Sequence, residues 1–159
     1  MPFPSAYATA SLLDRLIDLK PRSDYEPIPL RVQTRKAFHA SLHRDLEWLL
    51  NTRCPVSETE LAQRERSVID YGRVDFGTFY INNPDDYGRL KQNFEEIITY
   101  YEPRLTEICV TITPKPHSHS QLLGLLEARL IVDDVDEQVS FPIVIDIKHG
   151  CGVKFISDE

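Results

Sequence analysis

The residues best suited to chemistry form the segment Tyr101-Glu102-Pro103-Arg104-Leu105. A carboxylate and a guanidinium flank a proline, so two opposite charges sit on a stiff corner of the chain. Such a pair has two uses. It closes a local salt bridge that stabilises the corner, or it binds a partner in the bidentate geometry that these groups favour. The residues alone leave both uses open.

Two pairs of histidines have spacings at which a metal ion is sometimes held. His39 and His43 are four residues apart, and His117 and His119 lie in a proline-flanked polar loop. Neither pair has an evident third ligand, and Ala40 stands where the metalloprotease pattern needs a glutamate. We therefore expect no metal and no other cofactor.

Other catalytic and ligand-binding patterns are also missing from the sequence. The acidic run Asp133–Glu137 lacks the glycine and closing glutamate of a calcium loop, so we expect a solvated hairpin tip. Cys54, Cys109 and Cys151 are odd in number and widely spaced, which is typical of free thiols in the cytosol. Because the sequence has neither a nucleophile elbow nor a phosphate loop, we predict no catalytic residue.

Composition narrows the class of protein further. The chain has 159 residues, of which 42% are hydrophobic, and this suits one domain with one core. No apolar run approaches the roughly 20 residues that a membrane-spanning helix needs. The net charge of -7 disfavours binding to nucleic acid. We therefore expect a cytoplasmic protein without direct membrane insertion.

Two stretches carry apolar residues at helical spacing. The first, Val32–Leu50, should stop at Asn51, and the second should start at Pro84 after the cap Asn83 and finish at Glu102, before the next proline. The expected buried stripes are Phe38, Leu42, Leu46, Leu49 and Leu50 in the first helix, and Tyr87, Leu90, Phe94, Ile97, Ile98 and Tyr101 in the second.

Beyond residue 104 the apolar pattern alternates. We expect strands over Ile108–Thr113, Leu122–Val132 and Val139–Ile147, and a short fourth strand over Val153–Ile156. Short connections favour antiparallel neighbours. The sequence therefore predicts an α+β fold in which two main helices pack on a small, mainly antiparallel β-meander. Pro142 requires its strand to be an edge or to be bulged at that point.

The start of the chain differs in character from the rest. Ser11–Leu19 should form short helical turns capped by Ser11, flanked by prolines and too short to be stable alone. We interpret residues 1–30 as a proline-rich docking extension and residues 31–159 as the folded domain. Residues 55–82 are expected to be mostly loop.

An ordered set of motifs runs along the chain. The motifs are Ser41-Leu42, then Arg44-Asp45-Leu46-Glu47-Trp48-Leu49-Leu50-Asn51-Thr52-Arg53, Tyr71-Gly72, Asp75-Phe76 and Glu102-Pro103-Arg104-Leu105. In this order they resemble the lysozyme-like baseplate wedge family of contractile phages. Within that family the chain is most similar to the TssE members of type VI secretion systems, which also tend to begin with the pattern found here at Ser11–Leu16. The resemblance covers residues 11–147.

The resemblance implies a structural adaptor. Such proteins sit in the baseplate wedge with TssF, TssG and TssK and help to start the TssB and TssC sheath. The family's corner motif, here Glu102, Pro103 and Arg104, is implicated in baseplate and sheath attachment. The Ser11–Leu19 segment, with Leu12, Leu13 and Leu16, would dock on a neighbour, and an open sheet edge would accept a strand from the sheath.

Two other functions are open alternatives. A lysozyme-like enzyme that degrades peptidoglycan needs two carboxyl groups across a sugar cleft. Glu102 is one candidate, but the neighbouring Arg104 favours its ionised form, which is wrong for a general acid, and no second carboxylate stands out. An anti-adaptor that binds a response regulator shares the Glu-Pro-Arg corner. The Ser11–Leu16 pattern argues against that second alternative.

Overall fold

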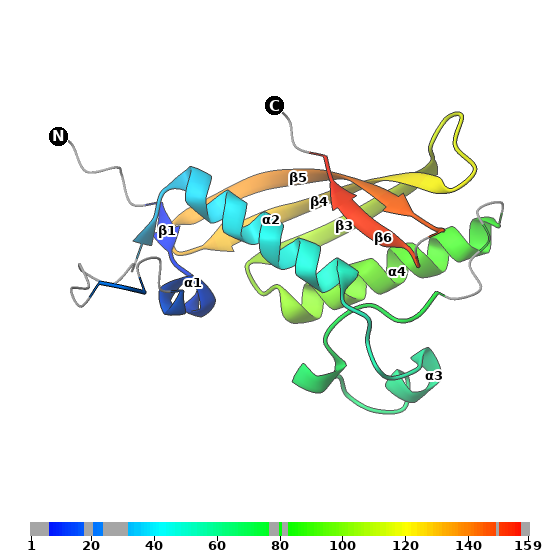
Figure 1. Ribbon diagram of the computed structural model, residues 1–159, viewed down its shortest axis with the longest axis horizontal. Helices are drawn as coiled ribbons and strands as arrows, with labels where there is room; N and C mark the ends of the chain where they lie inside the picture. Colours follow the sequence, from blue (N-terminus) through cyan, green and yellow to red (C-terminus); the bar gives the residue numbers. More distant parts are fainter. Residues whose placement is uncertain are drawn as a thin grey trace.

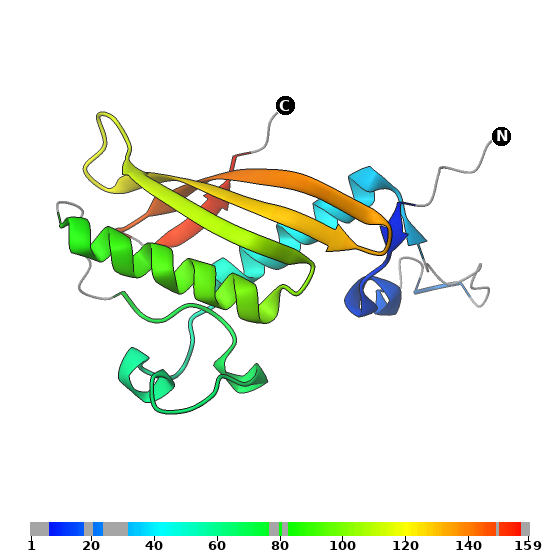
Figure 2. The ribbon, with the colours of Figure 1, turned by 180° about the vertical axis from the view of Figure 1, so that it is seen from behind.

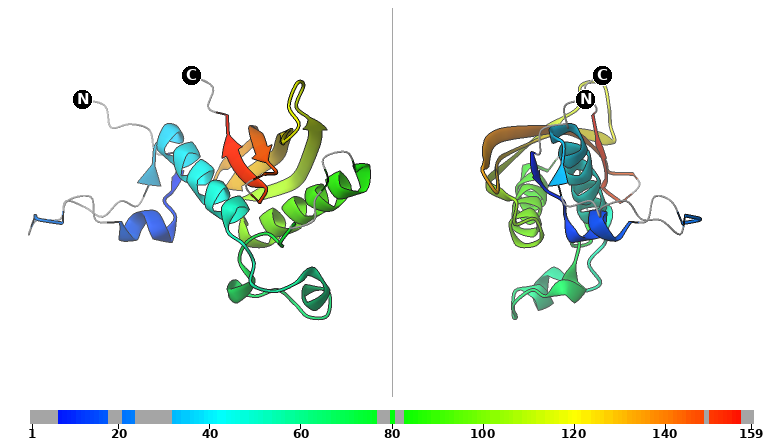
Figure 3. Two further views of the ribbon diagram at one scale, coloured as in Figure 1. Left: turned by 45° about the vertical axis from the view of Figure 1, so that its right-hand side comes forward. Right: turned by 90° about the vertical axis from the view of Figure 1, so that its left-hand side faces the viewer.

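Two long helices lie on one face of a four-stranded antiparallel sheet (Figure 1). The computed structural model describes residues 7–17, 21–23, 32–76, 80, 83–148 and 150–156. Both views in Figure 3 show the loop region with α3 below the sheet and the two long helices. The predicted α+β fold is confirmed.

Both helices begin where a side chain caps them. Helix α2 (Arg35–Asn51) starts after Thr34, whose hydroxyl accepts from the backbone N–H of Ala37. Helix α4 (Pro84–Tyr101) starts after Asn83 and ends at the residue before Glu102. These bounds confirm the two predicted helices, except that Val32 belongs to a strand.

The sheet follows the chain as a meander in the order β3-β4-β5-β6. Its strands are β3 (Leu105–Pro114), β4 (Gln121–Val132), β5 (Val135–Asp146) and β6 (Gly152–Phe155). Each strand pairs antiparallel with the next, and a tight turn at Asp133 joins β4 to β5. The predicted strands are confirmed, and Figure 2 shows the long β3, β4 and β5 from behind. The expected hairpin tip Asp133–Glu137 was too long, because Val135–Glu137 already pair with β4 and only Asp133 and Asp134 form the turn.

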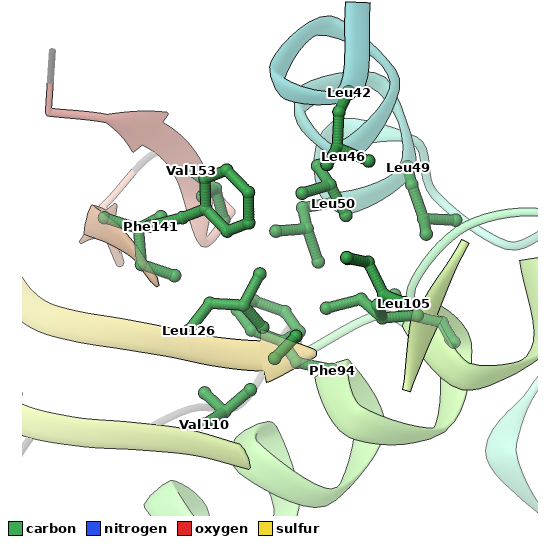
Figure 4. Packing of buried hydrophobic residues seen from close by; sticks show 14 of the residues in the cluster. Leu42, Leu46, Leu49, Leu50, Phe94, Leu105, Val110, Leu126, Phe141 and Val153 are labelled. Carbon is green, nitrogen blue, oxygen red and sulfur yellow. The ribbon is translucent and has the colours of Figure 1, made fainter. Parts of the chain in front are cut away.

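The core lies between the sheet and the two helices (Figure 4). Leu42, Leu46 and Leu50 of α2 meet Phe94 of α4 and the inward side chains of the strands, including Phe141. All the predicted stripe residues of α2 are buried. In α4 the centre of the stripe is buried, whereas Tyr87 and Tyr101 at its ends are half-buried.

The N-terminal segment packs against the domain. Strand β1 (Ala8–Thr9) pairs with β2 (Val32–Gln33), and neither strand was expected from the sequence. Helix α1 (Leu12–Leu16) follows, and its predicted cap is confirmed because the Ser11 hydroxyl accepts from the N–H of Asp14. Leu19, also expected in this helix, lies outside the described residues.

The described residues between α2 and α4 are mostly loop, as expected, apart from helix α3 (Glu58–Leu61) and the 3₁₀ turn Val68–Asp70. Arg73 ties it to the rest of the molecule. Its buried guanidinium donates to the carbonyl of Leu50 at the end of α2 (3.0 Å) and to that of Gly150 before β6. These two bonds tie the loop at Arg73 to the end of α2 and to the residues before β6.

Candidate partner-binding surfaces

The Glu-Pro-Arg corner forms a closed ion pair. Arg104 donates from Nε to Glu102 Oε1 (2.5 Å) and from Nη2 to Glu102 Oε2 (2.6 Å), and Glu102 is only 5% exposed. Burial opposes the charge on Arg104, but its hydrogen bonds to Glu102 and Asp45 raise its pKa above the ordinary value. Of the two uses that the sequence left open, the structure has the local salt bridge, and Pro103 is the exposed member of the corner.

The ion pair continues across the surface into α2 and α1. Nη2 of Arg104 also donates to Asp45 Oδ2 (2.7 Å), and the other oxygen of Asp45 accepts from Nε and Nη2 of Arg44 (3.0 and 2.7 Å). Nη1 of Arg44 donates to Asp14 Oδ1 in α1 (2.7 Å). Five alternating charges, Asp14, Arg44, Asp45, Arg104 and Glu102, therefore form one chain of hydrogen bonds, which we call the charge chain.

A hollow of about 400 Å³ lies beside the charge chain. It brings Leu13 of α1 together with the corner, so the structure places these two predicted binding elements at one site. Leu12 and Leu16 do not line the hollow but are 69% and 72% exposed on the same helix. The lining residues are Ser11, Leu13, Asp45, Trp48, Leu49, Tyr71, Tyr101, Glu102, Pro103 and Arg104.

Several residues of this site were not predicted. Trp48 is 50% exposed and lies under the guanidinium of Arg44, with 5.2 Å from Cζ to the ring centroid. Asp45, Trp48 and Leu49 share one face of α2 because they are three and four residues apart. An exposed tryptophan on the same helical face as an aspartate was the available signal.

A second candidate surface is the outer edge of β5. Strand β6 pairs only with Ile143–Asp146, so Val135–Phe141 has a strand neighbour on one side only among the described residues. The N–H of Ile156 donates to the carbonyl of Pro142 (2.8 Å), so the backbone of Pro142 faces away from β4. Pro142 therefore sits at an edge without a bulge, which is one of the two predicted arrangements.

The other sheet edges carry side-chain partners. Glu95 of α4 accepts from the N–H of Val110 in β3 (2.9 Å). The amide of Asn51 bonds both backbone groups of Val153 in β6, accepting at 2.8 Å and donating at 2.9 Å. Val135–Phe141 of β5 is thus the longest stretch of edge backbone without such a contact among those that the structure describes.

A groove of about 590 Å³ runs between this edge and α2. His43 packs there against the rings of Phe141 and Phe155, with centroids 5.0 and 4.8 Å away, and burial followed by the nearby His39 lowers its pKa. His39 instead contacts Glu137 (2.8 Å). No cluster of three metal-ligating side chains occurs among the described residues.

Comparison with known proteins assigns the family. Residues 36–135 match the family of baseplate wedge protein gp25. The chain belongs to the gp25 family. The matched region begins in α2 and ends at the start of β5, so it contains the Glu-Pro-Arg corner but not α1. No curated protein matches the chain.

Two solved structures are similar in fold. One is "The baseplate complex from the type VI secretion system", with 15% identity over 77% of this chain and 97% of that chain, at a TM-score of 0.49. The other is described as a tail lysozyme from Geobacter sulfurreducens, with 19% identity over 66% of this chain and 88% of that chain, at a TM-score of 0.44.

Membership of the gp25 family makes this chain a structural component of a baseplate. In the described part of this gp25-family chain, no helix combines the length and hydrophobicity needed to cross a membrane.

Proposed function

We propose that the chain is a structural adaptor of the TssE kind in the cytoplasmic baseplate of a type VI secretion system, without enzymatic activity. It joins the wedge proteins TssF, TssG and TssK and starts assembly of the TssB and TssC sheath. The observation that carries the proposal is the open edge of β5 beside a groove, in a chain of the gp25 family.

The sheath contact is strand addition to β5. Backbone groups of alternate residues in a strand point to the same side, so Gln138 and Ser140 face outward like Pro142. An extended sheath segment pairs with these N–H and C=O groups and places alternate side chains in the groove next to α2. Main-chain pairing supplies affinity, and the groove sets the register.

The wedge contact is the hollow between α1 and the corner. Its exposed rim consists of apolar and aromatic side chains, among them Leu13, Trp48 and Pro103. Tryptophan is among the residues that most often dominate the binding energy of interfaces, so Trp48 is the expected centre of this contact. Residues 1–30 act as the docking extension of the domain 31–159, and Leu12 and Leu16 extend the contact along α1.

The geometry of Glu102 disfavours the lysozyme-like alternative. Both carboxylate oxygens accept from Arg104, and the side chain is buried. A general acid must instead carry a proton and reach the substrate. Reproducible release of sugar from peptidoglycan that Glu102→Gln abolishes would overturn the structural assignment.

Proline at position 140 tests strand addition. Ser140→Pro removes an outward N–H while leaving the hydrogen bonds between β4 and β5, whereas Ser140→Ala keeps the N–H. We expect Ser140→Pro to weaken capture of the TssB–TssC complex by about tenfold, in line with roughly 1.4 kcal/mol of lost pairing. Ser140→Ala should bind like the original chain.

The readout is affinity for purified sheath subunits, with the far-UV circular dichroism of each variant as the check on folding. Equal affinity of the proline and alanine variants, both folded, would refute the β5 edge as the binding site. Absence of sheath and wedge proteins from the eluate of the unaltered chain would refute the adaptor role as a whole.

A further inference from the structure

Asp45 lies at the junction of the charge chain. Its Oδ1 accepts from Arg44 and its Oδ2 from Arg104, each with a shortest distance of 2.7 Å. The two guanidiniums then reach into different parts of the chain. Arg44 holds Asp14, 30 residues earlier, and Arg104 is 59 residues after Asp45.

One side of the junction fixes helix α1. This helix has five residues, far fewer than an isolated helix needs to be stable in water. Asp14 is its one buried residue, and its carboxylate accepts from Arg44 and from the hydroxyl of Ser11 (both 2.7 Å). The position of α1 therefore depends on the orientation of the Arg44 guanidinium, which holds Asp14.

The other side of the junction fixes the corner. Arg104 uses Nε and Nη2 for Glu102 and shares Nη2 with Asp45, and its Cζ lies 5.6 Å from the ring centroid of Phe38. Its Nη1 is buried without an acceptor among the described residues. Loss of Asp45 would therefore remove one of the two carboxylates that Arg104 contacts.

We infer that Asp45 is a positioning residue that holds α1 and the Glu-Pro-Arg corner in register, so that the two elements act as one docking surface. This inference rests on the proposed wedge contact for its purpose. The coupling itself is a property of the chain alone. A change at the corner alters how often α1 unfolds locally. A partner that binds either α1 or the corner therefore stabilises the other.

Trypsin cleavage after Arg15 measures the opening of α1, because Arg15 is exposed and the protease cuts only the locally unfolded segment. The full-length chain is digested under native conditions, and the rate of cut at this bond is followed by mass spectrometry. We expect Asp45→Asn to raise this rate about fivefold or more.

Two further variants separate coupling from general damage. Arg104 bonds Glu102 and Asp45 and makes no described hydrogen bond to α1, so Arg104→Gln should raise the rate after Arg15 severalfold only through Asp45. Glu47→Gln removes one negative charge from the same helix two residues from Asp45 and should leave the rate unchanged. Asp45→Glu, which retains the carboxylate, should restore part of the protection.

The outcomes test two claims separately, namely the coupling between α1 and the corner and the proposed wedge contact. If Arg104→Gln leaves cleavage after Arg15 at the original rate, or Asp45→Asn behaves like Glu47→Gln, the coupling does not exist. If Asp45→Asn does not fold, the Arg104→Gln rate alone decides. If the rates change as expected but the unaltered chain captures no TssF or TssG, the coupling stands and the proposed wedge contact fails.

Binding adds a readout that instability alone would not move. Leu13→Ala and Pro103→Ala, one on each element, should reduce affinity for TssF–TssG non-additively in the original chain. Their effects should become additive in the Asp45→Asn background. Additive effects in both backgrounds would show that the two elements bind independently.

Discussion

Single residues fix the approach of the loop to the end of α2. Gly72 has φ of +111°, a conformation that side chains with a Cβ rarely adopt. A Cβ on Gly72 would lie 2.4 Å from the carbonyl oxygen of Thr52, which accepts from the N–H of Arg73 (2.9 Å). This close backbone contact places the neighbouring Tyr71 at the hollow.

Alanine at position 72 should therefore be costly. We expect Gly72→Ala to lower the free energy of unfolding by at least about 2 kcal/mol, since strain and steric overlap add. Gly88→Ala is the matched control, because a Cβ there meets nothing within 4 Å in helix α4. That control should stabilise the protein by about 1 kcal/mol. Urea denaturation measures both, and equal midpoints for the two variants would contradict the argument.

At the residue level, the sequence indicated the Glu-Pro-Arg corner but not the residues of α2 that its arginine contacts. Adjacent charges such as Arg44 and Asp45 are ordinary on a helix surface, and nothing in their spacing shows that Asp45 reaches Arg104. That contact exists because α2 and the corner meet in three dimensions. The aromatic rim was missed for the same reason, as Tyr71 and Trp48 come together only in the fold.

Among the elements, β6 depends on a side chain for its outer pairing. The Asn51 amide accepts from the N–H of Val153 and donates to its carbonyl, which are the two bonds that a neighbouring strand would make. Its Nδ2 also donates to the carbonyl of Glu47 (2.8 Å). One residue thus joins the end of α2 to the last strand of the sheet.

Removal of this amide should loosen β6. We expect Asn51→Ala to lower the free energy of unfolding by about 1–3 kcal/mol, because Val153 is left with unpaired backbone groups. Hydrogen exchange should speed up at Val153 and change little at Leu126 in the centre of the sheet. Unchanged exchange at Val153 would show that water replaces the amide without loss.

Elements with strong periodic patterns could be predicted, and short ones could not. The helices and the meander follow from apolar spacing, caps and prolines. Strands β1 and β2 have two residues each, too few to show a period, and they form because Val32–Gln33 passes beside the N-terminal segment. The sequence indicated an open edge, but not which one. The edge of β5 is open because β6 is short, whereas Glu95 contacts the backbone of β3 at Val110.

Across the whole molecule, carboxylates paired with arginine stabilise the fold at neutral pH, and acid removes this stabilisation by protonating them. The paired Arg64 guanidinium lowers the pKa of Asp70 to about 2, and Arg129 lowers that of Asp136. Burial opposes ionisation of Asp14, but hydrogen bonds from Arg44 and Ser11 lower its pKa. Because these folded-state values lie below the unfolded value of about 3.9, stability is present above that pH and is lost as the pH falls.

Asp70→Asn tests this acid dependence. The variant should be less stable than the original chain at pH 7, since its Arg64 loses a carboxylate partner. As the pH falls from about 5 to about 2, the melting temperature of the original chain should fall further than that of the variant, by a few degrees. Thermal melts across this range measure the difference. Parallel curves would mean that Asp70 is not ionised preferentially in the folded state.

The exposed backbone of β5 also affects how the free protein associates with itself before it binds a partner. An unpaired strand margin is a template on which another copy can align, and repeated alignment leads to fibrils. Asp136 and Glu137 lie on that margin, and each is paired with cationic side chains of the same chain, Asp136 with Arg129 and Glu137 with Arg35 and His39. Charged side chains on an edge strand discourage sideways pairing of sheets, so a second copy would have to break these ion pairs in order to align along β5.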